Sequence, residues 1–61
     1  MSVREAKELA DLRQALRDHL IAQDAGGATD VLTRLREVAS GDHELNAEYE
    51  RWAFRFELLA A

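Results

Sequence analysis

The chain contains no cysteine and no proline, and only three of its 61 residues are glycine. Without cysteine it forms no disulfide and offers no thiolate to a metal ion. Without proline it lacks the residue that most strongly interrupts a helix. A domain of this size buries only about 60% of the surface that its unfolded chain exposes, so its stability alone is marginal. Association with another chain is the remedy that this composition leaves open.

Positive charge is also scarce, because eight basic residues stand against twelve acidic ones, for a net charge of −4. Nonspecific binding to nucleic acid or to an anionic membrane needs a clustered basic surface. No apolar run approaches the roughly 20 residues of a membrane span. The N-terminal residues lack the apolar core of a signal peptide. We therefore expect a soluble, cytoplasmic protein that binds no membrane.

What the chain does contain is helical periodicity. Ser2 and Glu5 have the spacing of a capping box, which predicts a first helix from near the first residue to Gln23. The segment Asp24-Ala25-Gly26-Gly27 is expected to end it, since adjacent glycines suit a turn. Arg13 lies at the edge of the apolar stripe and must find an acceptor if that face is buried. The stripe comprises Ala6, Leu9, Leu12, Leu16 and Leu20, and Val3, Ala10 and Ile21 are expected to widen one flank.

A second, shorter helix is predicted to begin near Ala28 or Thr29, with Asp30 in its first turn able to pair with Arg34. Gly41 suits the left-handed residue that closes it. Asp42 then serves as the N-cap of a third helix. The fold class is thus all-α, with residues 1–61 forming a single antiparallel three-helix bundle in the order long, short, long. Whether the first helix packs on its own chain or on a second one is left open.

One face of the third helix has the spacing of a buried stripe, with apolar residues at steps of four, three, four and three. We assign this stripe to the core, where the indole N–H of Trp52 should find an acceptor. The predicted core comprises Leu9, Leu12, Leu16, Leu20, Leu32, Leu35, Leu45, Tyr49, Trp52, Phe56 and Leu59.

The opposite face of the same helix is apolar as well. At about 100° per residue, Ala47, Phe54, Leu58 and Ala61 fall together on the far side. Two other helices cannot surround the third, so we predict that this second face is the interface of a homodimer. Charged residues of opposite sign border it and suit the register of an antiparallel or two-fold helix pair. One edge carries Asn46, Glu50 and Glu57, and the other carries Arg51, Arg55 and Glu44.

The residues that could carry catalysis or bind a metal are better explained by local structure. The hydroxyl candidates are Ser2, Ser40, Thr29 and Thr33, and the two serines lie at predicted helix ends. His19 and His43 each follow an aspartate, but adjacent residues on a helix point about 100° apart and do not converge on one ion. We therefore expect no catalytic residues, no metal site and no cofactor.

Two nucleic-acid alternatives remain beside protein binding. The turn Ala39-Ser40-Gly41-Asp42 between two helices invites comparison with a helix-turn-helix unit, although Asp42 stands where an apolar residue is usual. That interpretation would gain force if the arginines formed one exposed patch. The arginines concerned are Arg13, Arg17, Arg34 and Arg36.

The other alternative is an acidic protein that mimics nucleic acid, although basic residues alternate with the acids along the first helix. Its acidic residues would be Glu5, Glu8, Asp11, Asp18, Asp24 and Asp30. The prediction that the residues favour is a small non-enzymatic protein-interaction module. We expect it to act as a regulator, adaptor or inhibitor of a larger protein and to form a homodimer.

Overall fold

The computed structural model describes residues 2–60, and within that range the chain forms three helices and no strand. Helix α1 spans Val3–Ile21, α2 spans Ala25–Val38 and α3 spans His43–Ala60. The all-α, three-helix prediction is confirmed, and helix lengths of 19, 14 and 18 residues follow the expected order. None of these helices, over the described range, is long and apolar enough to cross a membrane.

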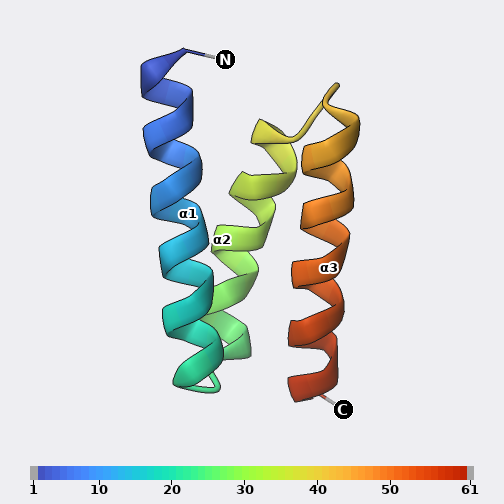
Figure 1. Ribbon diagram of the computed structural model, residues 1–61. Helices are drawn as coiled ribbons and strands as arrows, with labels where there is room; N and C mark the ends of the chain where they lie inside the picture. Colours follow the sequence, from blue (N-terminus) through green and yellow to red (C-terminus); the bar gives the residue numbers. More distant parts are fainter. Residues whose placement is uncertain (1, 61) are drawn as a thin grey trace.

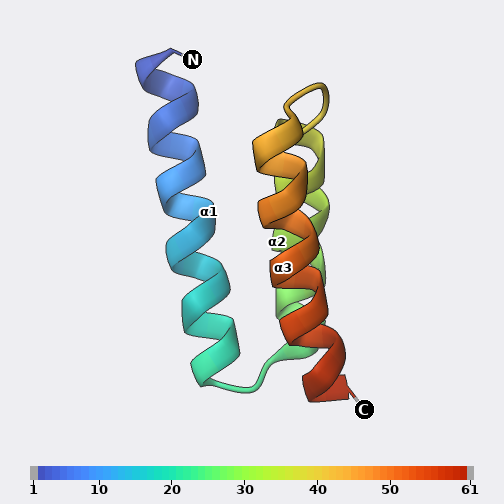
Figure 2. The same cartoon turned by 45° about the vertical axis from the view of Figure 1, so that its right-hand side comes forward.

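The short helix α2 holds the other two together. Figure 1 shows α1 and α3 on either side of α2, with the chain reversing direction at each connection. Turned by 45°, the molecule shows α3 in front of α2 and α1 to one side (Figure 2). Helix α2 packs extensively on both α1 and α3, whereas α1 and α3 approach each other only weakly. Helix α1 thus packs on its own chain, and it does so chiefly on α2.

The core lies along the faces that α1 and α3 turn toward α2. Leu16 of α1 and Leu35 of α2 are completely buried, and burying such a side chain contributes roughly 1.5–3 kcal/mol. Ala28 and Ala39 are also fully buried, and their small side chains let neighbouring helices approach α2 closely. All predicted core residues belong to this cluster. Leu9, Leu16, Leu35, Leu45, Trp52 and Phe56 are buried, and Leu12, Leu20, Leu32, Tyr49 and Leu59 are partly buried against them.

The connection between α1 and α2 differs from the predicted glycine turn. Helix α1 ends at Ile21, and Gln23 takes the left-handed conformation with φ of 57°. The Gln23 amide donates to the Leu20 carbonyl at 3.1 Å, and the Asp24 amide donates to the His19 carbonyl at 2.8 Å. These two bonds form a Schellman motif, in which glycine is the usual left-handed residue. The reversal therefore occurs before the glycines.

The predicted start of the second helix, near Ala28 or Thr29, is wrong by about one turn, because Asp24 caps a helix that begins at Ala25. The Asp24 carboxylate accepts a hydrogen bond from the Gly27 amide at 2.8 Å, which satisfies an otherwise unpaired donor of the first turn. A Cβ at Gly27 would meet this carboxylate and come within 2.8 Å of His19 Cε1. The glycine leaves room for these two side chains in the positions that they occupy.

The other predicted helix ends are observed. The Ser2 hydroxyl accepts from the Glu5 amide at 3.2 Å, which is the N-cap half of the expected capping box. Gly41 has φ of 82° between α2 and α3. The Asp42 carboxylate accepts from the Leu45 amide at 3.1 Å and caps α3.

The expected widening of the buried face of α1 is wrong. Val3 is 88% exposed and Ile21 is 82% exposed, and the side chains of Ala6 and Ala10 also face solvent. Because α1 packs extensively only on α2, a single narrow stripe on α1 is covered. A helix in a closed bundle would have a second neighbour over the flank.

Candidate protein-interaction surface

The outer face of α3, defined by Ala47, Phe54 and Leu58, is apolar and open to solvent. Phe54 is 60% exposed and Leu58 is 61% exposed, and Ala47 is exposed as well. These residues line a shallow depression together with Glu50, Arg51 and Arg55. Ala61, the fourth residue of the predicted interface, lies outside the described residues. The structure thus brings Ala47, Phe54 and Leu58 together on one surface.

Two charged edges border this face. One edge, the acidic edge, carries Asn46, Glu50 and Glu57. The other, the basic edge, carries Arg51, Arg55 and, toward the start of α3, Glu44, and all six side chains are exposed. The Arg55 guanidinium lies over the Trp52 ring, 4.9 Å from its centroid, a cation–π geometry that holds the arginine against the helix. The apolar face is therefore flanked by charges of opposite sign, and part of the basic edge rests on the core.

On the side of α3 that faces α1, Glu48 connects the two helices. Its carboxylate accepts two hydrogen bonds of 2.7 Å from Nε and Nη2 of Arg13. A third hydrogen bond of 3.2 Å comes from the indole Nε1 of Trp52. These bonds, chiefly those from Arg13, lower the pKa of Glu48 below its ordinary value of 4.5 and outweigh the opposing effect of burial. Arg13 finds the acceptor that its place beside the core requires, and the predicted indole partner is Glu48.

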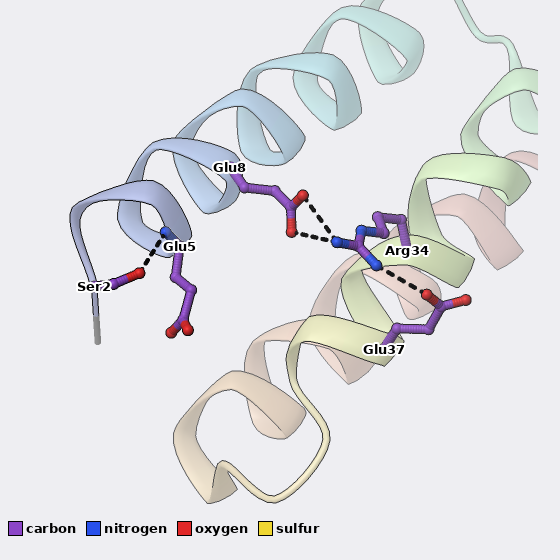
Figure 3. A network of polar contacts seen from close by, with 5 residues as sticks. All are labelled: Ser2, Glu5, Glu8, Arg34 and Glu37. Carbon is purple, nitrogen blue, oxygen red and sulfur yellow. Dashed lines mark hydrogen bonds and ion pairs between the residues drawn. The ribbon is translucent and has the colours of Figure 1, made fainter.

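A second polar network joins α1 to α2 (Figure 3). Arg34 Nη2 donates to both carboxylate oxygens of Glu8 at 2.8 and 2.9 Å, and its Nη1 donates to Glu37 at 3.0 Å. The predicted partner of Arg34 was Asp30, four residues before it. In the structure Glu8 of the neighbouring helix takes that role, which sequence spacing does not reveal. All three side chains are substantially exposed, so this network orients helices more than it stabilises them.

The residues considered for catalysis are dispersed over the molecule. The hydroxyls of Thr29 and Thr33 donate to backbone carbonyls four residues earlier, those of Ala25 and Thr29. Ser2 caps α1, and Ser40 lies in the α2–α3 connection. Within residues 2–60, none of these four hydroxyls forms a hydrogen bond with a histidine.

The two histidines considered as metal ligands also lie apart, His19 near the end of α1 and His43 at the start of α3. His19 Nδ1 is 3.3 Å from the carboxylate of Asp24, which caps α2. The carboxylate that His19 contacts is therefore that of Asp24 and not that of the preceding residue, Asp18. Over residues 2–60 no three metal-binding side chains come together. The geometry of the described chain therefore assembles no cation site.

The charged residues considered for nucleic-acid binding are partly engaged within the chain. Arg13 binds Glu48 of α3, and Arg34 binds Glu8 of α1 and Glu37 of its own helix, so two of the arginines are paired with carboxylates. Among the acidic residues proposed for mimicry, Glu8 binds Arg34, Asp18 accepts from Gln14, and Asp24 caps α2. These pairings reduce the charge that either surface can present to a ligand.

No protein-family model, no curated protein and no solved structure matches this chain.

Proposed function

We propose that this chain is a small non-enzymatic protein-interaction module that forms a homodimer through the outer face of α3. In this proposal it regulates, links or inhibits a larger protein. The observation that carries the proposal is the exposure of Phe54 and Leu58, one helical turn apart on one face, at 60% and 61%. Two large apolar side chains that adjoin on a helix form a continuous patch, and such patches are typical of protein contacts.

The exposed apolar residues of α1 are arranged differently. Val3 and Ile21 lie at opposite ends of the helix, 18 residues or about 27 Å apart. Between them the same side of α1 carries Lys7, Gln14 and Arg17, with the small residue Ala10 as the one apolar side chain. Isolated surface apolar residues are normal in soluble proteins. They also remain available to a larger protein when α3 is occupied by a second copy.

The whole molecule exposes more surface than a compact chain of its mass. Its accessible area is 4407 Å², whereas folded monomers of 6.9 kDa expose about 4,000 Å². The exposed apolar face of α3 adds to this area. Covering that face removes apolar surface from water at a gain of roughly 25 cal/mol per Å².

The dimer should be weak. Helix α3, with 18 residues, offers a face about 27 Å long and about 10 Å wide. Stable complexes bury about 800 Å² on each partner, which one helix face of this size approaches only if flanking arginine stems join the contact. Partial burial of Phe54 and Leu58 in both copies contributes several kcal/mol, opposed by the entropy of association. We therefore expect a dissociation constant in the micromolar to submillimolar range.

Sedimentation equilibrium from about 10 μM to about 1 mM tests the proposal, since this range spans that affinity. Wild-type protein should change from monomer to dimer, and the Phe54→Glu, Leu58→Glu double variant should stay monomeric. The matched control is Val3→Glu, Ile21→Glu, which adds the same charge at equally exposed apolar sites on α1 and should dimerise like the wild type. Circular dichroism of all three proteins verifies that each is folded. A monomeric wild type at the highest concentration would contradict the homodimer.

A salt titration of binding to a polyanion distinguishes the nucleic-acid alternatives. Affinity at low salt that falls steeply as salt rises would identify a nucleic-acid-binding protein. Competition with nucleic acid for a basic protein target would instead identify an acidic mimic. The interaction module proposed above should show neither behaviour.

A further inference from the structure

The two charged edges of the outer face of α3 restrict how a second copy can bind. The centre of this face runs through Ala47, Phe54 and Leu58. At about 100° per residue, Glu50 lies about 60° to one side of that line and Arg51 lies about 40° to the other. Two turns beyond Glu50, Glu57 continues the acidic edge, and one turn beyond Arg51, Arg55 continues the basic edge. A partner that covers the apolar centre must therefore contact both edges.

A symmetric dimer joins the same face of both copies, so a two-fold axis relates them. If that axis runs along the helices, the two α3 helices are parallel, and the acidic edge of each copy faces the basic edge of the other. If the axis is perpendicular to the helices, they are antiparallel, and like edges face each other. In the antiparallel case Glu50 of one copy lies near Glu57 of the second copy. Charge complementarity therefore distinguishes the two arrangements and favours the parallel pair, although the sequence alone also suggests an antiparallel one.

We infer that the second copy binds with its α3 parallel to the first, so that each acidic edge faces a basic edge. This inference rests on the proposed homodimer and adds its orientation. In parallel helix pairs, an edge residue contacts the partner residue five positions further along, which pairs Glu50 with Arg55 of the second copy. Arg51, nearer the centre, turns outward to Glu50 of the second copy. The apolar residues then meet their own equivalents along the centre line.

Oxidative cross-linking tests this orientation directly, because the natural chain contains no cysteine. In a parallel dimer, the thiols of two Ala47→Cys chains lie opposite each other across the centre line. In an antiparallel dimer, residue 47 lies opposite residue 58, and the two thiols are separated by about 16 Å along the axis. Ala47→Cys should form a disulfide-linked dimer at least about tenfold faster than the control Ala10→Cys, since the dimer raises the effective concentration of its thiols. Ala10 is an exposed alanine on α1.

The sign of a charge effect gives a second, independent test. Glu50→Gln, Glu57→Gln removes attraction across a parallel dimer but removes repulsion across an antiparallel one. The control Glu5→Gln, Asp11→Asn changes the net charge equally at exposed sites on α1. Relative to this control, the first variant should dimerise roughly two- to tenfold more weakly, as expected for a few exposed ion pairs. Sodium chloride should also weaken the wild-type dimer, because salt screens the attraction between the edges.

The outcomes separate this inference from the proposed function. A wild type that stays monomeric overturns both. A wild-type dimer that Phe54→Glu, Leu58→Glu dissociates supports the interface. If that same dimer fails to cross-link through Ala47→Cys, or tightens when Glu50 and Glu57 become glutamine, the parallel orientation is overturned and the interface stands.

Discussion

Glu48 holds together the two helices that pack least on each other, so its removal should destabilise the fold strongly. Glu48→Ala deletes two charge-assisted hydrogen bonds of 2.7 Å from Arg13. It also leaves the indole N–H of Trp52 without its acceptor, in a residue that is only 6% exposed. Such a buried donor costs about 1–3 kcal/mol when it is unpaired. The Glu48 side chain is 17% exposed and that of Arg13 is 38% exposed, so solvent screening reduces the ion-pair contribution.

Together these effects predict a loss of about 2–3 kcal/mol for Glu48→Ala. A 61-residue domain has a free energy of unfolding of roughly 3–9 kcal/mol, so this loss is a large fraction of the total. The assay is urea unfolding followed by the fluorescence of Trp52, the single tryptophan. With a urea dependence near 1 kcal/mol per molar, the midpoint should fall by about 2–3 M. The exposed variant Asp11→Ala is the control and should change stability by less than about 0.5 kcal/mol.

A double-mutant cycle with Arg13→Ala isolates the ion pair from the indole contact. We expect a coupling energy of about 1–2 kcal/mol between Arg13 and Glu48, because the pair is bidentate and partly buried. A coupling below about 0.3 kcal/mol, the additivity expected of independent sites, would refute the role assigned to this pair. Trp52→Phe in a Glu48→Ala background should restore part of the lost stability, since it removes the unpaired donor.

Three further predictions concern stability. The pKa of Glu48 in the folded protein is below 4.5. The stabilisation that the Glu48 carboxylate provides is therefore present above that pH and is lost as the pH falls through the folded pKa. Between about pH 5 and about pH 3, the urea midpoint should fall less in Glu48→Gln than in the wild type. Gln23→Gly should raise the free energy of unfolding by about 0.5–1 kcal/mol by relieving the left-handed conformation, whereas Ala22→Gly, at φ of −77°, should lower it. If Gln23→Gly instead lowered the free energy of unfolding, that result would contradict the left-handed end assigned to α1. Leu35→Ala should lower the free energy of unfolding, followed by thermal denaturation, by about 2–5 kcal/mol, and Ile21→Ala should lower it by less than about 0.5 kcal/mol. Equal effects of the two substitutions would contradict the assignment of the core.

Local signals in the sequence predicted much of the fold. The caps at Ser2 and Asp42 and the left-handed Gly41 each depend on residues within one turn, and all three appear in the structure. The stripe of four-and-three spacing on α3 also identifies its buried face correctly. These features are predictable because neighbours along a helix determine them.

The errors arise where distant parts of the chain decide the outcome. Asp24-Ala25-Gly26-Gly27 has the composition of a turn, yet Asp24 caps a helix there and Gly27 accommodates His19. Arg34 has Asp30 one turn away, yet Glu8 from α1 is its partner. Spacing along one helix carries no information on which side another helix will cover.

The same distinction applies to the candidate surface. Periodicity alone placed Ala47, Phe54 and Leu58 on one face, and their exposure depends on α2 occupying the other side of α3. The flank of α1 at Val3 and Ile21 had a similar pattern and was expected to widen the buried stripe, yet both residues are exposed. The number of helices that cover a given helix, which only the tertiary arrangement specifies, separates the two cases.

The claim that Phe54 and Leu58 are covered by a second copy is tested most directly by nuclear magnetic resonance on a sample mixed from isotope-labelled and unlabelled chains. A filtered nuclear Overhauser experiment in such a sample detects only contacts between different molecules. We predict cross-peaks from the Phe54 ring and the Leu58 methyl groups to the same residues of the second copy at concentrations near 1 mM, at the upper end of the expected affinity. The absence of intermolecular cross-peaks from either side chain, in a sample that is folded at that concentration, would contradict the account.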